Sequence, residues 1–326
     1  MNAVGIDVSK GKSMIAVMRP FGEVVISPFE VWHTDSELSE LAKLLKNLSG
    51  ETRVVMEYTG SYHAPIARVL SAAGLYVSAV NAMLVHDYGN NSLRRAKTDK
   101  KDALKLANYA LDHWLTLPRY APEEDIRLML KNSYRQYEQY SKLRTMLKNN
   151  LISLLDQVFP GANRLFNSPR RADGSEKWID FVGAFWHREC VSGLSEKTFT
   201  GRYLKWCRKQ GYNFSESKAH KIYTFASSCI AVMPSSDATR LLVEQAVSQL
   251  RATATALAVI QQKMEALAAS LPEHQVVMQM FGVGPALGPQ LMAEIGDVRR
   301  FHSKKALVAF AGIDAPPYQS GQPQYF

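Results

Sequence analysis

The sequence has little cysteine: only Cys190, Cys207 and Cys229 occur among its 326 residues. Three widely spaced thiols provide neither a disulfide framework nor a zinc site, and they indicate reduced cysteines in a cytoplasmic protein. The chain also lacks an apolar run long enough to span a bilayer, and charge begins at Asp7, too early for a signal peptide. We therefore expect a cytoplasmic protein with no membrane partner.

Acidic residues are outnumbered by basic ones. The chain has 30 Asp and Glu against 39 Lys and Arg, which gives a formal net charge of +9 with neutral histidines. A basic balance favours a polyanionic partner such as nucleic acid, although an ordinary solvated basic surface would have the same composition. Hydrophobic residues make up 46% of the chain, and the length suffices for two or three domains with cores of their own.

The first 80 residues predict a mixed five-stranded sheet with helices on its faces. Three apolar runs joined by short turns come first, and two further strands then alternate with amphipathic helices. A three-strand meander followed by such alternation is typical of an RNase H-like α/β fold. The expected strands are 3–8, 12–18, 22–31, 52–57 and 75–80, with helices over 34–48 and 62–73.

Four carboxylates follow or flank these elements. Asp7 and Glu57 each close an apolar strand, and Asp99 and Asp102 lie three residues apart at the start of a predicted helix. The helical spacing places the latter two on one face, and the ends of neighbouring strands meet at one edge of a sheet. Four such carboxylates repel one another, so their convergence predicts a site for a divalent cation, Mg²⁺ or Mn²⁺.

Each acid taken alone has another interpretation. Asp7 can be a turn residue, and Glu57 can be the buried partner of Arg53 or Arg68. Asp99 can cap its helix, a position for which Thr98 competes. The joint pattern of four acids is what favours a metal site.

Two long helices are predicted in the rest of the chain, over 123–157 and 238–270, and they are suited to pairing with each other or with another subunit. The basic stretch 160–234 between them contains Trp178 and Trp206 as well as Trp186. Its aromatic rings can stack on bases amid phosphate-binding cations, or they can be buried beneath a solvated basic face. The cations concerned are Arg164, Arg170, Arg171, Arg188, Arg202, Lys205, Arg208, Lys209, Lys218 and Lys221.

A glycine turn between two predicted helices contains Gly282 and Gly284. It resembles the hairpin of a helix-hairpin-helix module, in which glycines let the backbone approach a phosphate. The alternative is an ordinary turn between helices.

Several of these segments, in order over nearly the whole chain, resemble the IS110 (DEDD) family of insertion-sequence transposases, also called bridge-RNA-guided recombinases. The resemblance is carried by Gly5-Ile-Asp-Val-Ser-Lys10, Met56-Glu-Tyr-Thr-Gly60, Lys97-Thr-Asp-Lys-Lys-Asp-Ala103, Phe281-Gly-Val-Gly284 and Phe310-Ala-Gly-Ile-Asp314. It implies a RuvC-like (RNase H-fold) catalytic domain whose Asp-Glu-Asp-Asp tetrad corresponds here to Asp7, Glu57, Asp99 and Asp102. It further implies magnesium, a structured guide RNA, donor and target DNA, a dimeric or tetrameric assembly, and a nucleoid-associated bacterial protein.

The resemblance also suggests the domain boundaries. We expect a catalytic domain at 1–116, a helical linker at 117–270 with a basic insertion at 160–234, and the start of a mostly α-helical transposase domain at 271–326. Basic residues beside the tetrad and the glycines of the turn are the expected nucleic-acid contacts. They are Lys10, Arg94, Arg95, Lys97, Lys100, Lys101, Gly282 and Gly284.

In the family a nucleophilic serine follows the Ala-Gly-Ile/Leu stretch, and this chain ends about where that segment should begin. Ser320 corresponds to the stretch before the nucleophile, so we do not assign it that role. We therefore expect metal and nucleic-acid binding without strand exchange. Two alternatives remain at this stage: a junction-type RNase H-like nuclease that uses the same tetrad, and a non-catalytic nucleic-acid-binding remnant.

Overall fold

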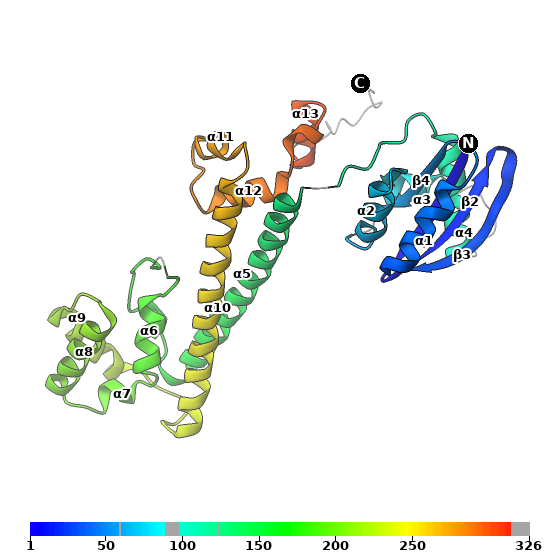
Figure 1. Cartoon of the computed structure of the whole chain (residues 1–326). Helices are drawn as coiled ribbons and strands as arrows, with labels where there is room; N and C mark the ends of the chain where they lie inside the picture. The colour runs from blue at the N-terminus through cyan, green and yellow to red at the C-terminus, as the bar shows by residue number, and fades with distance from the viewer. Residues whose placement is uncertain (59, 89–97, 123, 172, 314–326) are drawn as a thin grey trace, which may run out of the picture. The chain divides into compact units, whose positions relative to one another are not determined.

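The computed structural model describes residues 1–58, 60–88, 98–122, 124–171 and 173–313. The chain divides into two compact units, Met1–Glu123 and Glu124–Phe326 (Figure 1). The first unit extends beyond residue 116 because the following segment folds back onto its sheet. The Tyr120 amide donates to the Val77 carbonyl at 2.7 Å, and the Tyr76 hydroxyl donates to the Leu117 carbonyl at 2.6 Å.

The first unit is built on a mixed five-stranded sheet, which confirms the fold predicted from the strand order. Its order is β3-β2-β1-β4-β5. Strands β1, β2 and β3 form an antiparallel meander, and β4 and β5 continue parallel to β1. The strands are β1 (Asn2–Ser9), β2 (Lys12–Arg19), β3 (Glu23–Trp32), β4 (Thr52–Glu57) and β5 (Tyr76–Val80), with a 3₁₀ turn at Pro20–Gly22.

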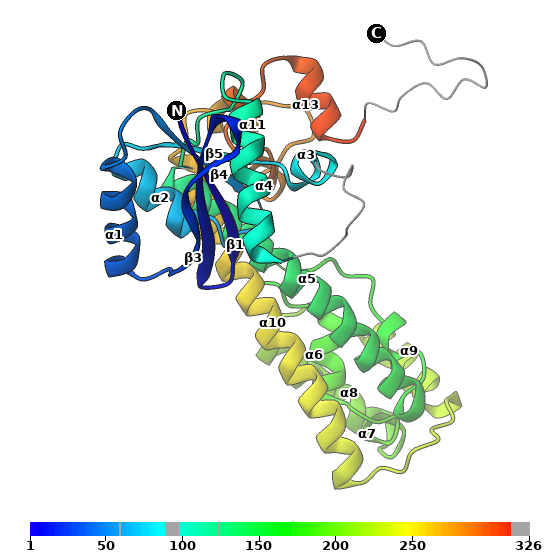
Figure 2. The same ribbon diagram turned by 90° about the vertical axis from the view of Figure 1, so that its right-hand side faces the viewer.

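Helices cover both faces of this sheet (Figure 2). Side chains alternate along each strand, so Val4 and Ile6 of β1 pack toward α1 (Asp35–Lys46) and α2 (Ala64–Ala72). The opposite face belongs to α4 (Asp99–Asp112), with α3 (Ala82–Asp87) before it. The core on that side includes Ala3, Val55, Leu106, Ala107 and Ala110.

The second unit is organised on two long antiparallel helices, as the sequence predicts. They are α5 (Asp125–Val158) and α10 (Asp237–Ala269), which lie side by side in both views (Figures 1 and 2). Leu130 near the start of α5 shares a core with Met264 near the end of α10. Leu155 near the end of α5 shares another with Val243 near the start of α10.

The basic stretch between these helices is a helical cluster with a large aromatic core. Phe159, Phe181 and Tyr203 are fully buried, and Trp178 and Trp206 are each only 7% exposed. The tryptophans therefore belong to the core, and of the two interpretations the buried one holds for Trp178 and Trp206. The cluster comprises a 3₁₀ turn at Ala162–Arg164 and helices α6 (Lys177–Ala184), α7 (Glu189–Ser192), α8 (Glu196–Gln210) and α9 (Glu216–Ser228).

Three short helices complete the second unit. They are α11 (His274–Met278), α12 (Leu287–Ile295) and α13 (Lys304–Phe310), with a 3₁₀ turn at Val298–Arg300. Met292 and Ala293 of α12 pack into the same core as Leu130 of α5. Among the residues described, no helix combines the length and the apolar character that crossing a bilayer demands.

Candidate functional site

Asp7 and Glu57 lie at the same edge of the sheet. The parallel register of β1 and β4 pairs Ile6 with Met56, so Asp7 and Glu57 are the next residues along two adjacent strands. Both are partly buried. By strand alternation Asp7 shares a face with Gly5, and Glu57 shares it with Val55. This is the face that α4 covers.

The first turn of α4 carries the other two acids to this face. A Cβ atom on Gly5 would lie 2.0 Å from the Ala103 carbonyl oxygen and 2.4 Å from the Ala107 amide nitrogen. Because Gly5 has no side chain, the helix backbone can approach β1 two residues before Asp7. Asp102 directly precedes Ala103 in the chain and is partly buried, whereas Asp99 is exposed.

The structure bears on two alternative roles, that of Asp99 as a helix cap and that of Glu57 as the partner of Arg53. Thr98 caps α4, its hydroxyl accepting a hydrogen bond from the Lys101 amide at 3.4 Å, so Asp99 is a helical residue and not the cap. Arg53 is paired with Glu51 at 2.8 Å and stacks between the rings of Tyr76 and Trp114. Its guanidinium is thereby held by a neighbour other than Glu57.

The four acids are not gathered into a complete ligand set. Among the described residues, all four acids included, no group of three or more His, Cys, Asp or Glu side chains is close enough to hold a metal ion. The structure brings Asp7 and Glu57 to neighbouring positions and sets α4 on their face. Carboxylate oxygens are the ligands that Mg²⁺ and Mn²⁺ prefer, so the donor type fits such an ion.

Lys12 is a cation at this edge that the sequence patterns did not single out. It begins β2 and lies on the same face as Asp7, because Asp7 pairs with Met14 and alternate residues share a face. The Lys12 Nζ lies 2.6 Å from Glu30 Oε2. This hydrogen bond raises the pKa of Lys12, and the charges of Glu30 and Asp99 add to the effect. Only the pairing of β1 with β2 could have revealed it.

The predicted nucleic-acid contacts fall in three places. Lys10 is exposed in the turn after β1, and Lys100 and Lys101 are exposed on the first turn of α4. All three flank the edge that carries the acids. Arg94, Arg95 and Lys97, like Ser320, lie outside the described residues.

The glycine turn joins α11 to α12. Gly282 has a φ of 80°, a conformation that glycine adopts without strain, and open space surrounds both Gly282 and Gly284 where a Cβ would lie. Close packing falls instead on Gly288, since a Cβ there would lie 2.6 Å from the Met278 Sδ. The sequence patterns singled out Gly282 and Gly284 but not Gly288.

Comparison with known proteins places the chain among transposases. The IS110 DEDD model, described as a transposase, matches residues 4–160, and the model of the IS116/IS110/IS902 transposase family matches residues 274–325. The chain belongs to the IS110 family of transposases. The first match includes Asp7, Glu57, Asp99 and Asp102, and the second includes the glycine turn.

Individual relatives agree with this family. The chain is 23% identical over 320 residues to the insertion element IS116 uncharacterized 44.8 kDa protein of Streptomyces clavuligerus, covering 98% of this chain and 77% of that protein. It is 30% identical over 89 residues to the pilin gene-inverting proteins of Moraxella lacunata and Moraxella bovis, which is 27% of either chain. By resemblance this family member is a DNA-recombining enzyme.

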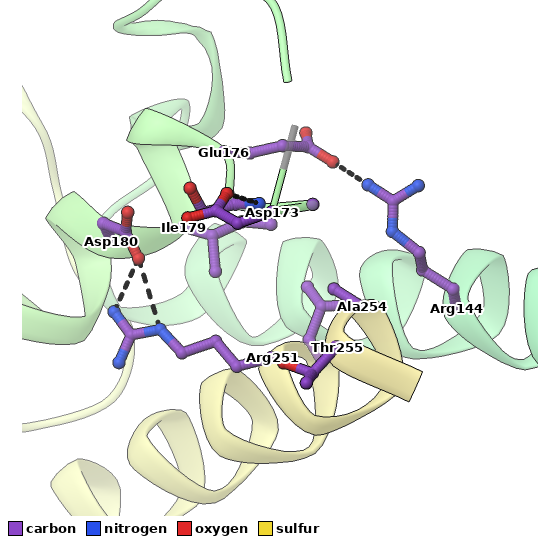
Figure 3. A pocket seen from close by; sticks show the side chains of 11 residues that line it. Arg144, Asp173, Glu176, Ile179, Asp180, Arg251, Ala254 and Thr255 are labelled. Carbon is purple, nitrogen blue, oxygen red and sulfur yellow. Dashed lines mark hydrogen bonds and ion pairs between the residues drawn. The ribbon is translucent and has the colours of Figure 1, made fainter. Parts of the chain in front are cut away.

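The second unit of this chain contains a pocket of about 220 Å³, far in sequence from Asp7, Glu57, Asp99 and Asp102 (Figure 3). Two ion pairs border it. Arg144 binds Glu176, and Arg251 Nη2 lies 2.8 Å from Asp180 Oδ1. The Ser175 hydroxyl near it is buried without a hydrogen-bond partner.

Glu176 is the most heavily bonded acid of this pocket. It accepts hydrogen bonds from Arg144, from Lys148 Nζ at 2.9 Å and from Trp178 Nε1 at 2.9 Å. Burial alone would raise the pKa of Glu176, but the bonds from Lys148 and Trp178 and the nearby positive charges outweigh it, and the pKa is lowered. The ion pairs Arg144–Glu176 and Arg251–Asp180 thus connect the start of α6 to α5 and α10.

Proposed function

We propose that this chain is a DNA transposase or recombinase of an insertion sequence, and that it acts through a divalent metal held by Asp7, Glu57, Asp99 and Asp102. The observation that carries the proposal is the backbone approach of α4 to β1 at Gly5. It sets the first turn of α4 on the sheet face that Asp7 and Glu57 share at the ends of parallel strands.

The chain's own residues would divide the work as follows. Asp7 and Glu57 would be supplied by two adjacent strands, and Asp99 and Asp102 by the first turn of α4. A bound Mg²⁺ or Mn²⁺ pair would supply positive charge to the oxygens of the phosphodiester that is cut. Lys12 offsets part of the negative charge at this edge.

The basic residues that flank the acids would hold the substrate. Lys10, Lys100 and Lys101 are exposed around the edge, where they can bind phosphates on either side of the cleaved bond. Arg94, Arg95 and Lys97 directly precede α4 in the sequence and extend the same basic stretch. The Gly282 and Gly284 turn of the second unit would contact a nucleic-acid backbone.

A structured guide RNA and a homo-oligomer, a dimer or a tetramer, complete the proposal. The net charge of +9 supports binding of nucleic acid. The long helices have exposed apolar side chains that suit contact with a second copy, among them Met146, Leu241 and Val259. The name of the Moraxella relatives, gene-inverting proteins, favours recombination over simple hydrolysis by a junction-type nuclease.

The deciding experiment compares metal-dependent stability in two variants. A ligand that binds only the folded state raises the melting temperature by mass action. Adding Mg²⁺ or Mn²⁺ should stabilise the parent chain and leave Asp7→Asn unchanged. Glu40→Gln, which removes an exposed carboxylate from α1, serves as the matched control and should respond like the parent. An equal response in all three chains would show that these acids do not hold the metal.

A further inference from the structure

Cations and aromatic rings alternate along one side of the helical cluster at 160–234. The Arg171 guanidinium lies 3.9 Å from the centre of the Tyr212 ring, and Lys177 Nζ lies 5.0 Å from the same ring. Lys177 Nζ, at the start of α6, is also 5.1 Å from the centre of the Phe166 ring, and Lys218 Nζ, on α9, is 5.2 Å from the same centre. We call these five residues the cation–aromatic ladder.

The Tyr212 hydroxyl of the ladder donates to Asp180 Oδ2 at 2.6 Å, whereas Arg171 and Lys177 are held by uncharged groups. Arg171 donates to the carbonyls of Gln210 and Gly211 at 3.0 and 2.8 Å, at the end of α8. Lys177 lies 3.5 Å from the Asn213 carbonyl. These contacts fix the positions of the side chains and leave their charge in place.

Two of the nearby carboxylates are already engaged with other cations. Glu176 binds Arg144, and Asp180 binds Arg251 (Figure 3). Lys148 also pairs with Glu176.

Asp173, in contrast, accepts a hydrogen bond from the Ser175 amide at 2.9 Å. The pKa of Asp173 is lowered, first by that bond and less by the charge of Arg171. In the part of the chain that the structure describes, no acid forms an ion pair with the three cations of the ladder. The described cations of the pocket border thus form ion pairs, whereas those of the ladder do not.

The positive charges of the ladder also act on one another. The pKa of Lys218 is lowered, first by burial and then by the charges of Lys221 and Lys177. Like charges brought this close destabilise each other, and a bound anion would relieve that cost. The arrangement is therefore more favourable with an anion present than without one.

We propose that the cation–aromatic ladder is a binding site for the phosphodiester backbone of nucleic acid. Phe166 is only 9% exposed, and both rings already face cations, so bases cannot stack on them. The site would therefore bind phosphates without reading sequence. The proposal rests on the proposed function, because a transposase must hold nucleic acid, and it assigns part of that task to the cluster between α5 and α10.

The test measures how salt weakens binding, by fluorescence anisotropy in EDTA, for duplex DNA, single-stranded DNA and a hairpin RNA. Each lost phosphate contact lowers the slope of log K against log salt by about 0.9 on duplex DNA and about 0.7 on single strands. Lys177→Gln/Lys218→Gln should therefore lower the slope by about 1.8 or about 1.4 for the nucleic acid that the ladder binds. The loss should be equal for unrelated sequences, and the probe that shows it identifies the ligand.

Two further variants control for the loss of charge and for its position. Lys177→Arg/Lys218→Arg keeps the charge and should keep the slope, and Lys43→Gln/Lys46→Gln removes two exposed lysines of α1 as a charge-matched control. If the double glutamine variant does not fold, the single change Lys177→Gln is measured instead and should lower the slope by about 0.9 or about 0.7. The proposed binding site would be wrong if the glutamine variant of the ladder had the parent's salt slope on all three probes. It would also be wrong if the α1 control lost as much slope as that variant. Because metal is absent here, that outcome is independent of the Asp7→Asn result.

Discussion

Gly5 of β1 and Ala103 of α4 approach each other backbone to backbone. A Cβ on Gly5 would lie 2.0 Å from the Ala103 carbonyl oxygen, closer than any two such atoms can lie. The contact stands two residues before Asp7 and one residue after Asp102. A glycine in a strand thus determines how near two pairs of acids can come, although it carries no chemistry itself.

The first prediction concerns this contact. Gly5→Ala forces α4 away from β1 and should destabilise the first unit by about 1–3 kcal/mol or more, as overpacking does. Hydrogen exchange of the β1 and α4 amides would report the loss locally.

Gly201→Ala is the matched control, because Gly201 lies in helix α8 with nothing within 4 Å of an added Cβ. Alanine in a helix is better than glycine, so this variant should gain up to about 1 kcal/mol. Unchanged exchange in Gly5→Ala would mean that α4 is not tightly packed on β1.

The second prediction concerns Lys12. Its charge lies on the face of Asp7 and acts on Asp99, so it should oppose a divalent cation bound at that edge. Lys12→Met should therefore lower the dissociation constant for Mn²⁺, measured by calorimetry, and the gain should shrink at high salt. Lys46→Met on α1 should leave the constant as it is. Weaker Mn²⁺ binding in Lys12→Met would contradict this prediction and would mean that Lys12 favours metal binding.

Local patterns in the sequence were enough for the sheet and for the long helices. Short apolar runs bounded by turns predicted the five strands, and apolar residues recurring every three to four positions predicted α5 and α10. Contacts between distant segments were not predictable in this way. Lys12 and Gly5 acquire their roles from strand pairing and from the position of α4, which no single stretch encodes.

The basic region between the long helices shows a different limit. Its helices are short, and its core is built from aromatic residues that sequence patterns cannot separate from stacking residues. Phe181 and Trp206 are core residues, whereas Tyr212 lies against two cations. Only packing distinguishes these environments, because all three are aromatic residues within a basic stretch.

The third prediction concerns pH and Glu176. The pKa of Glu176 is lowered in the folded chain, so its contribution to stability is present above the ordinary value of 4.5 and is lost as pH falls through the folded pKa. The melting temperature of the second unit should thus fall below about pH 4.5. Glu176→Gln should flatten this dependence and cost about 1–3 kcal/mol at neutral pH, because Arg144 and Lys148 lose a charged acceptor.

Glu216→Gln is the control for this experiment, since Glu216 is exposed at the start of α9. Its melting profile should follow that of the parent chain. If Glu176→Gln melts like the parent both at neutral pH and below about pH 4.5, the ion pairs of Glu176 do not stabilise the packing of α6 on the long helices.

The fourth prediction concerns Arg127, which is 4% exposed at the start of α5. It donates to both carboxylate oxygens of Glu273, one of them at 3.1 Å, and lies 3.4 Å from the Gly296 carbonyl. One guanidinium thereby binds both ends of the segment that carries α11, the glycine turn and α12. Lysine cannot reproduce this forked geometry, so Arg127→Lys should cost about 1.5–3 kcal/mol although the charge is kept.

The loss should be confined to residues 273–296, where proteolysis and hydrogen exchange would accelerate while α6 to α9 stay protected. Arg299→Lys provides the comparison, because Arg299 pairs with Asp297 at 2.8 Å but is 69% exposed, and exposed pairs contribute little. If the two variants lost stability equally, the forked geometry would not matter. If only Arg127→Lys loosened the segment, the proposed binding of nucleic acid by the Gly282 turn should weaken without any change in the turn itself.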